Sequence, residues 1–523
     1  MGRSYVMQWI KATPRLFTAA WSAVLLGACA ASDAPTAPVT PPPPPPPPTP
    51  VAFTVPTVAR EFRGLWIATV ANIDWPSRSG LTVAQQQTEF SLILDAAEQA
   101  GLNAIVLQVR AAGDALFPST LEPWSRSLTG TQGVDPGYDP LAYAITQARL
   151  RGIEVHAWFN PFRAGNLSDT LRLASTHFAV RRPDLARRYC TQLWFDPGEA
   201  AVQDQSIAVI TDVLRRYDVD AVHLDDYFYP YPDSRCAGLD FPDGATFATY
   251  QRSGGLLARA DWRRDNVNRF VERLYRESHA VAPKARVGIS PFGIWRPGTP
   301  AGIVGLDSYA SIYADSRLWL QRGWVDYFAP QLYWSIASTG QSFGSLLSWW
   351  GQQNTLRRHL WPGLAAYRVS DGSASSYVAA EIPAQVQLTR AQNAAAGGST
   401  GSLLYNTTVV LNDRGGLRSL LAGGVFATRA LPPATHWLDA VAPPAPTMIV
   451  TSTGAVLRVS ITPVTSEPLS WYLIRWRTNG AWSQRLQRVS ALTADVPSAG
   501  TDGVVINAID KVGNASTDVV WRP

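Results

Sequence analysis

The chain contains 523 residues, of which 46% are hydrophobic and 16% are charged, and its formal net charge is +5. This length exceeds one ordinary globular core and suits one large domain plus a small module. The net charge is small for the length, and no run of Lys or Arg offers a stripe for a phosphate backbone. The composition therefore argues against a nucleic-acid partner.

The first 28 residues have the pattern of an export signal. Three basic residues precede the apolar segment 16–28, which is too short to span a bilayer as a stable helix and ends in small residues. The sequence LGAC, which ends at Cys29, resembles the lipobox of bacterial lipoproteins and implies a lipid on that cysteine. An ordinary secretory peptide with a chance cysteine is the alternative. By resemblance to known sorting rules, the two alanines after Cys29 indicate a lipid-anchored protein of the bacterial cell envelope, in the outer membrane facing the periplasm.

A Pro-rich segment follows in residues 29–57. It contains eight consecutive prolines, which adopt the extended polyproline II conformation because each ring fixes its backbone φ angle. We predict a lipidated, semi-rigid tether that holds the folded part away from a membrane.

Cys190 and Cys236 remain once Cys29 is assigned to a lipid. In an oxidising compartment these two cysteines form a disulfide or stay as buried thiols, and we favour the disulfide. Neither a CxxC nor an HxxxH pattern accompanies them, so the sequence predicts no metal site there.

Short apolar runs alternate with helical patterns over residues 58–432, which is typical of βα units and a parallel sheet. The eight runs are Gly64–Val70, Asn103–Val109, Ile153–Phe159, Val219–Asp225, Arg286–Ser290, Val325–Ala329, Leu360–Ala365 and Gly401–Tyr405. The helical patterns between them include 85–99, 140–150, 204–217, 265–278 and 380–395. We predict an α/β fold, a (β/α)8 TIM barrel. A doubly wound open sheet is the competitor, but no glycine-rich phosphate loop follows the first run.

Residues 440–523 have a different pattern, with short alternating runs separated by turn signals. This pattern predicts a small all-β sandwich of about seven strands. Its last stretch, AIDKVGNAS, resembles the closing hairpin of fibronectin type III domains. We expect this domain to act in spacing, docking or weak glycan contact rather than in chemistry.

The active site of such a barrel is built at the carboxyl ends of its strands. Because side chains alternate along a strand, the apolar face of each run should meet the helices and the other face should line the interior. Six polar residues then converge inside the mouth: Gln108, Arg110, His156, Asn160, His223 and Asp225. Taken one at a time, each has an ordinary structural interpretation, such as a hydrogen-bonded core histidine. The same alternation turns Asp225 inward and leaves Asp226 at the start of the loop.

Several separated blocks over residues 59–430 resemble the glycosyl hydrolase-like 10 family, whose members are relatives of the α-amylase-type barrels. The blocks include EFRGLWIATVANIDWPS, LNAIVLQVRAAGDALFPSTLEPWS, GIEVHAWFNPFR, VDAVHLDDYFYPYP, VGISPFGIWRP and VDYFAPQLYW. The family includes a lipoprotein glycosidase of bacterial cell division that cuts glycan strands stripped of stem peptides. The resemblance implies a glycoside hydrolase that needs no cofactor and acts on a polysaccharide, with peptidoglycan as the leading candidate.

The resemblance also implies a set of cleft residues. Carried over to this sequence, they are Arg110, Asp114, Glu122, His156, Asn160, Asp225, Asp226, Gln331, Tyr333 and Trp334. Asp225 takes the place of the nucleophile that α-amylase-type barrels carry on the fourth strand. Those relatives place a glutamate acid after the fifth strand, whereas ISPFGIW has no carboxylate there.

The identity of the proton donor is therefore open at the level of sequence. Glycoside hydrolysis uses two carboxyl groups, and Asp225 and Asp226 can cooperate only if the backbone turns between them. Glu122 is the next candidate for the acid. Asp114 is the fallback, with a structural salt bridge to Arg110 as its alternative role.

Aromatic residues just beyond the strand ends are candidates for sugar subsites, although packing under a loop is the alternative for each. They are Tyr227, Phe228, Tyr229, Tyr231, Trp295, Tyr333 and Trp334. The competing hypothesis for the whole chain is a non-catalytic envelope lipoprotein that binds glycan or scaffolds a partner. A metal held by His223, Asp225 and Asp226 is less favoured, because no spaced histidine pair completes the ligand set.

Overall fold

The computed structural model describes residues 53–396 and 401–523. The predicted export signal, the predicted lipidation site Cys29 and most of the predicted tether lie outside the described residues. The chain divides into two units, Met1–Phe53 and Thr54–Pro523. In the part that is described, no helix is both long and apolar enough to cross a membrane.

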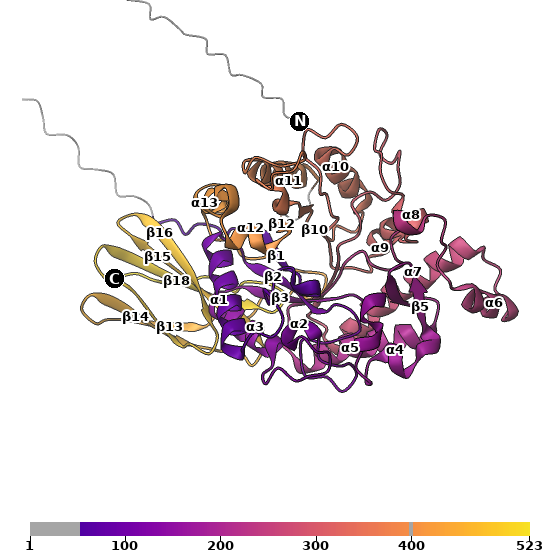
Figure 1. The fold of residues 1–523 in the computed structure, drawn as a ribbon. Helices are drawn as coiled ribbons and strands as arrows, with labels where there is room; N and C mark the ends of the chain where they lie inside the picture. Colours follow the sequence, from indigo (N-terminus) through magenta and orange to yellow (C-terminus); the bar gives the residue numbers. More distant parts are fainter. Residues whose placement is uncertain (1–52, 397–400) are drawn as a thin grey trace, which may run out of the picture. The chain divides into compact units, whose positions relative to one another are not determined.

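Nine parallel strands form the main sheet of the second unit, as expected for a TIM-like domain (Figure 1). In spatial order they are β10 (His359–Leu360), β9 (Tyr327–Phe328), β8 (Arg286–Ile289), β7 (Ala221–Leu224), β3 (Glu154–Phe159), β2 (Ala104–Arg110), β1 (Phe62–Ile67), β12 (Gly401–Leu404) and β11 (Gly363–Leu364). Each of the eight predicted runs overlaps at least one of them. All nine are buried along their length, which is why the sequence shows them as nearly continuous apolar runs.

The predicted strand Leu360–Ala365 is two short strands in the structure. β10 pairs with β9 and β11 pairs with β12, so the two ends of the strand order are consecutive in the chain. Pro362 interrupts the run because it has no amide hydrogen to donate to a ladder. Its carbonyl still accepts a hydrogen bond of 3.0 Å from the Leu403 amide.

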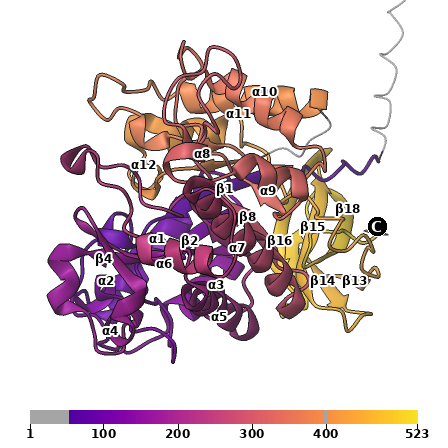
Figure 2. The same cartoon turned by 90° about the vertical axis from the view of Figure 1, so that its right-hand side faces the viewer.

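Helices surround these strands in both views (Figure 1, Figure 2). The long ones are α1 (Val83–Gln99), α3 (Pro140–Leu150), α5 (Ala200–Arg216), α7 (Arg259–Val281), α10 (Phe343–Gln353) and α11 (Glu381–Ala396), and the five predicted helical patterns fall on five of them. Short helices are α2 (Arg126–Thr129), α4 (Phe178–Arg181), α6 (Gly244–Arg252), α8 (Ser308–Ser311), α9 (Ser316–Arg322), α12 (Thr407–Leu411) and α13 (Leu417–Gly423). Thr82 starts α1 with a capping box, and Asp139 caps α3 before a proline at its first turn.

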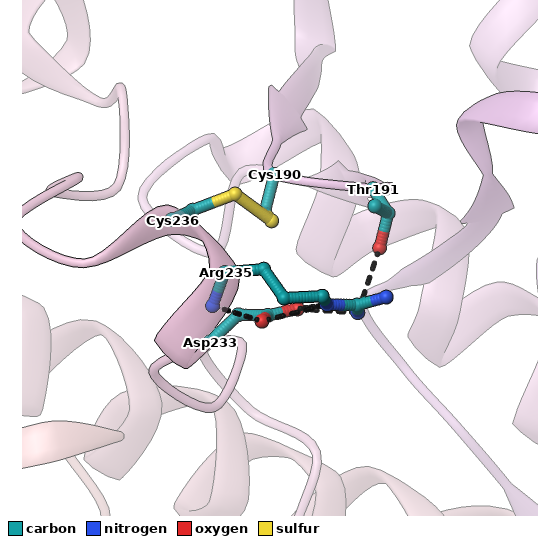
Figure 3. The surroundings of a disulfide bond; sticks show 5 residues. All are labelled: Cys190, Thr191, Asp233, Arg235 and Cys236. Atoms are coloured by element: carbon teal, nitrogen blue, oxygen red, sulfur yellow. Dashed lines mark hydrogen bonds and ion pairs between the residues drawn. A yellow bond between two sulfur atoms is a disulfide. The ribbon is translucent and has the colours of Figure 1, made fainter.

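A three-stranded antiparallel sheet lies between β3 and α5 in the sequence. It contains β4 (Arg163–Asn166), β6 (Gln192–Phe195) and β5 (Ala186–Tyr189) in that order. The predicted cysteine pair, Cys190 and Cys236, forms a disulfide that joins the turn between β5 and β6 to the loop after β7. Figure 3 shows Arg235 beside the disulfide, where it pairs with Asp233 and reaches the hydroxyl of Thr191.

The C-terminal region has seven strands in two antiparallel sheets, in agreement with the predicted all-β pattern. One sheet has the order β13 (Thr447–Ser452), β14 (Val456–Thr462), β17 (Thr493–Pro497), and the other β16 (Ala481–Arg488), β15 (Leu469–Thr478), β18 (Thr501–Asp510), β19 (Val519–Trp521). Their shared core includes Val459 from the first sheet and Ile474 and Val504 from the second. Alternate residues face this core, which explains the period-two pattern of the sequence.

The C-terminal region and the segment that leads into it contact the amino-terminal ends of strands of the main sheet. Arg60, just before β1, donates to the carbonyl of Gly513 over 2.6 Å. The indole of Trp437 donates over 2.7 Å to Asp326, which directly precedes β9. The ammonium of Lys511 lies 2.7 Å from Oδ1 of Asp218. The carboxyl ends of the strands, where barrel active sites form, are at the other end of the sheet.

Candidate active site

A cavity of about 360 Å³ opens at the carboxyl ends of the barrel strands. It is lined by Trp66, Trp158, Asp225, Asp226, Tyr227, Tyr231, Ser290, Phe292, Gln331, Tyr333 and Tyr405. Asp225 and Asp226 are the only acidic residues in this lining. The cavity therefore combines one pair of carboxyl groups with several aromatic faces, the combination that sugar-binding sites use.

Asp225 ends a chain of buried side-chain hydrogen bonds. Nδ2 of Asn160 donates to Oδ2 of Asp225 over 2.6 Å, and Nε2 of Gln108 donates to Oδ1 of Asn160 over 2.7 Å. The Tyr227 amide donates to the other carboxylate oxygen over 3.2 Å. Strands β2, β3 and β7 thus bring together three of the six residues for which side-chain alternation predicted convergence.

Asp226 lines the same cavity, although simple alternation placed it on the opposite face. Strand β7 ends at Leu224 and the backbone bends at Asp226, so the alternation of strand side chains no longer holds there. The hydroxyl of Tyr231 donates to Oδ2 of Asp226. Gln331 also forms a side-chain hydrogen bond with Asp226 and donates to the Ser290 carbonyl over 2.8 Å.

The two aspartates differ in how readily they ionise. Burial, and then the charge of Asp226, raise the pKa of Asp225 to about 7. Burial raises the pKa of Asp226 to about 6, against hydrogen bonds from Tyr231 and Gln331 that lower it. Asp226 has the lower pKa and loses its proton first, and its charge then adds to the effect of burial in opposing ionisation of Asp225. Between these pKa values the pair holds one proton and one negative charge, the two states that glycoside hydrolysis requires.

Glu122 has a structural position rather than a place in the cavity. Its two carboxylate oxygens accept hydrogen bonds of 2.8 and 2.5 Å from Nε and a terminal nitrogen of Arg110. The two side chains are 0% and 1% exposed, and neither lines the cavity. Arg110 also donates to the carbonyls of Asn160 and Pro161, over 2.5 and 3.1 Å. This ion pair fixes the loops around β2 and β3, and it leaves Glu122 unsuited to donate a proton to a sugar.

Asp114 lies outside the main cavity as well. Its Oδ1 accepts a hydrogen bond of 3.0 Å from the Ala112 amide, and it lines a second, smaller cavity. The salt bridge to Arg110 that was the alternative for Asp114 is made by Glu122 instead.

His156 and His223 lie beneath the cavity and support its floor. Both Nδ1 atoms hydrogen-bond the hydroxyl of Tyr327, over 2.9 and 2.8 Å. Nε2 of His223 reaches Oγ of Ser290 over 2.9 Å, and Nε2 of His156 lies 3.3 Å from Glu154. Burial lowers the pKa of both imidazoles, so they are neutral. Neither histidine lines the cavity, and both ring nitrogens of His223 form hydrogen bonds with protein side chains.

The predicted aromatic residues divide into two groups. Tyr227, Tyr231 and Tyr333 line the cavity. The others do not line it. Tyr229 is 0% exposed and packs against Phe241 and Tyr313, and Phe228 is 1% exposed. Trp295 stacks on Trp349, and Trp334 packs edge-on against Phe292. Tyr229, Trp295 and Trp334 are therefore not among the residues that line this cavity.

Sequence reasoning missed several lining residues, namely Trp66, Trp158, Ser290, Phe292 and Tyr405. Trp158 shares its strand face with Asn160, so alternation along β3 already contained that signal. Side-chain alternation along the first run, Gly64–Val70, would have placed Trp66 on the inward face as well. Phe292 and Tyr405 lie beyond strand ends, where no period identifies them.

A group of three acidic residues elsewhere has ligand spacing for a metal ion. Asp439, Glu467 and Asp510 place one oxygen each within 4.8 Å of one another. The ammonium of Lys284 lies 2.8 Å from Asp439 and 2.5 Å from Glu467, so a side-chain cation already offsets their charge. This cluster links the barrel to the C-terminal region and lies outside the cavity.

Residues 61–378 match the family described as glycosyl hydrolase-like 10, and this span carries Trp66, both aspartates and Tyr333. The chain belongs to the glycosyl hydrolase-like 10 family. It is a glycoside hydrolase, as the sequence predicted. Membership of this family does not support the alternative of a non-catalytic envelope protein.

Two relatives extend the match beyond the family's core. The chain is 39% identical over 395 residues to glycosyl hydrolase YngK of Bacillus subtilis (strain 168), covering 74% of this chain and 76% of that protein. It is 34% identical over 341 residues to glycosyl hydrolase DigH of Escherichia coli (strain K12), covering 61% and 76%. Among solved structures, the glycoside hydrolase domain of PgaB (BpsB) from Bordetella bronchiseptica matches 69% of this chain and 98% of its own, with 14% identity and a TM-score of 0.46.

Proposed function

We propose that the protein hydrolyses the glycan strands of bacterial cell-wall peptidoglycan, with Asp225 and Asp226 as the reacting pair. The observation that carries the choice of residues is their shared cavity, in which they are the only acids and hold one proton between pKa values of about 6 and 7. The export signal in the sequence supports the choice of substrate, because it directs the enzyme to the compartment that contains this polymer.

The environments of the two aspartates favour Asp225 as the proton donor, in place of the nucleophile role that the family resemblance implied for it. Asp225, which keeps its proton to higher pH, donates it to the glycosidic oxygen as the bond to the anomeric carbon breaks. Asp226 stays ionised and stabilises the positive charge that develops on the sugar ring. A water molecule then attacks the anomeric carbon, and the proton that it loses restores the single proton of the pair. Tyr227, Tyr231 and Tyr333 offer ring faces for the sugars on either side.

The test uses the mature chain from residue 29 onward with Cys29→Ser, so that it stays soluble. Peptide-free glycan strands, intact peptidoglycan and an uncharged polysaccharide are each incubated with it, and new reducing ends are counted. We expect product from the peptidoglycan strands and a loss of about 100-fold or more in Asp225→Asn and Asp226→Asn. Asp261→Asn, at an acid 54% exposed on α7, is the matched control and should keep full activity. Product only from another polysaccharide would overturn the substrate, and an active Asp225→Asn enzyme would overturn the assignment of the acid.

We also propose the domain organisation that the sequence predicted. A closed (β/α)8 barrel over residues 58–432 is supported by the two end strands of the sheet being consecutive in the chain. A fibronectin type III-like sandwich over residues 440–523 is supported by its sheets of three and four antiparallel strands. The lipid anchor on Cys29, in the outer membrane facing the periplasm, is supported by the sequence pattern alone. Labelling cells with a radioactive fatty acid tests it, since the wild type should take up label and Cys29→Ala should not.

A further inference from the structure

A second cavity of about 150 Å³ lies among the loops that follow β1, β2 and β3. Its wall includes Thr69 and Val70, whose amides both donate to Oε1 of Gln108 over 3.0 and 2.9 Å. Gln108 is the side chain that also holds Asn160 against Asp225. One buried side chain, Gln108, therefore supports both the wall of the second cavity and, through Asn160, the reacting pair.

Arg163 connects the walls of the two cavities. It lines the second cavity, and its guanidinium carbon lies 5.5 Å from the ring centre of Tyr227, which lines the first. Its charge also favours the ionised form of Asp225, so it lies within electrostatic reach of the reacting pair. A substrate that filled both cavities would pass this guanidinium.

The guanidinium of Arg163 has no carboxylate partner among the residues that the structure describes. Arg110 provides the contrast, since its side chain is saturated by both oxygens of Glu122 and by two carbonyls. The lining of the second cavity contains two arginines, Arg126 and Arg163, and one acid, Asp114. Arg163, whose charge acts on Asp225, is therefore available to pair with a ligand.

We propose that Arg163 binds a carboxylate carried by the sugar unit next to the bond that is cleaved. A guanidinium that stacks on an aromatic ring keeps its N–H edge available, and that edge matches the two oxygens of a carboxylate. The ligand class is a carboxylated sugar, and in peptidoglycan the lactyl carboxylate of N-acetylmuramic acid is such a group. This inference rests on the proposed function for the identity of the sugar. It makes Arg163 a specificity-determining residue that selects charged over neutral glycans.

A different role for Arg163 makes a different prediction. If its charge served only to tune Asp225, its removal would slow cleavage of every substrate by the same factor and would shift the pH profile on all of them. Recognition of a carboxylate affects the charged substrate alone.

The experiment compares two substrates of equal length. One is peptide-free glycan with its lactyl carboxylates intact, and the other is the same glycan after carbodiimide activation and borohydride reduction to the alcohol. We expect the wild type to prefer the charged glycan in kcat/KM by roughly 10- to 100-fold, the range for one charge-assisted pair. Arg163→Gln should remove this preference, Arg163→Lys should keep part of it, and Arg188→Gln, at an exposed arginine of β5, should leave it unchanged.

Two results would overturn the inference. One is a wild-type enzyme that cleaves both glycans equally well, and the other is an Arg163→Gln enzyme that slows on both by one factor. If the wild type cleaves neither glycan, the proposed function fails, and the inference is decided by calorimetric titration of the two glycans into the wild type and Arg163→Gln. Tighter binding of the charged glycan that depends on Arg163 would support it, and equal binding would reject it.

Discussion

Nδ2 of Asn160 lies 2.6 Å from Oδ2 of Asp225 and donates a hydrogen bond to it. Rotation of the Asn160 side-chain amide by 180° would break a second hydrogen bond, because Oδ1 of Asn160 accepts from Gln108 at the same time. A donor aimed at a carboxylate favours the ionised form, so this contact lowers the pKa of Asp225 against the larger effect of burial. Asn160 thus limits how far the pKa of the proposed acid rises.

Replacement of Asn160 by Ala should raise the pKa of Asp225 further. The acid then stays protonated to higher pH, so the alkaline limb of the kcat/KM profile should move upward while the maximum falls about tenfold through lost orientation. The measurement is reducing-end release across pH 5 to 9 with the wild type as reference. An unchanged alkaline limb would show that Asp225 is not the group that titrates there.

Substitution of Asp225 by Asn should stabilise the protein at neutral and alkaline pH. The folded-state pKa of Asp225 is raised from 3.8 to about 7, so the contribution of this group to stability is fully present below pH 4 and is lost as the pH rises toward 7. Asn carries no charge to bury, and the gain in unfolding free energy should therefore grow over this window to a few kcal/mol. Urea unfolding at pH 4 and pH 8 checks this, with Asp261→Asn as the exposed control; an equal gain at both pH values would contradict it.

Glu122→Gln separates a structural role from a catalytic one. The change leaves the buried charge of Arg110 without its counter-ion, which costs about 3 kcal/mol or more when one partner of a buried pair is removed. The variant should unfold at lower urea concentration, yet its folded fraction should keep the wild-type pH profile because Asp225 and Asp226 are untouched. A folded Glu122→Gln protein with less than a hundredth of the activity would return Glu122 to the list of proton donors.

The disulfide between Cys190 and Cys236 should contribute about 4 kcal/mol, the chain-entropy value for a sequence separation of 46 residues. It secures the loop after β7 that carries Tyr231, the donor to Asp226. A Cys190→Ser, Cys236→Ser protein should unfold at lower urea concentration and lose activity before global unfolding. Dithiothreitol should shift the wild type in the same direction and leave the double variant unchanged.

The strands and part of the site were predictable from the sequence. Strands buried on both faces appear as continuous apolar runs, so all eight runs fall on strands of the main sheet. Alternation along the second and third runs correctly turned Gln108 and Asn160 inward, where Gln108 donates to Asn160 and Asn160 donates to Asp225. The rule worked because these positions lie in or directly beside regular strand.

Side-chain alternation did not predict how far along its strand each inward residue lies. His156 and Asn160 share a face, but four residues at about 3.3 Å each separate them by roughly 13 Å along the strand, so His156 bonds Tyr327 below the cavity and Asn160 reaches Asp225. Alternation gives the face of a residue and not its height. The pairing of Arg110 with Glu122 rather than Asp114 depends on how one loop folds back, and no spacing in the sequence contains that information.

The hydrogen bond from Trp437 to Asp326 couples the thermal unfolding of the two parts of the protein that it joins. Asp326 is 0% exposed, and its carboxylate oxygens also lie within hydrogen-bond reach of His279 and Tyr275. One of the groups that stabilise this buried acid is thus supplied from beyond the barrel, by the segment that leads into the C-terminal strands. The barrel and the C-terminal strands should therefore lose their structure together, in one cooperative calorimetric transition, although only the barrel contains the reacting groups.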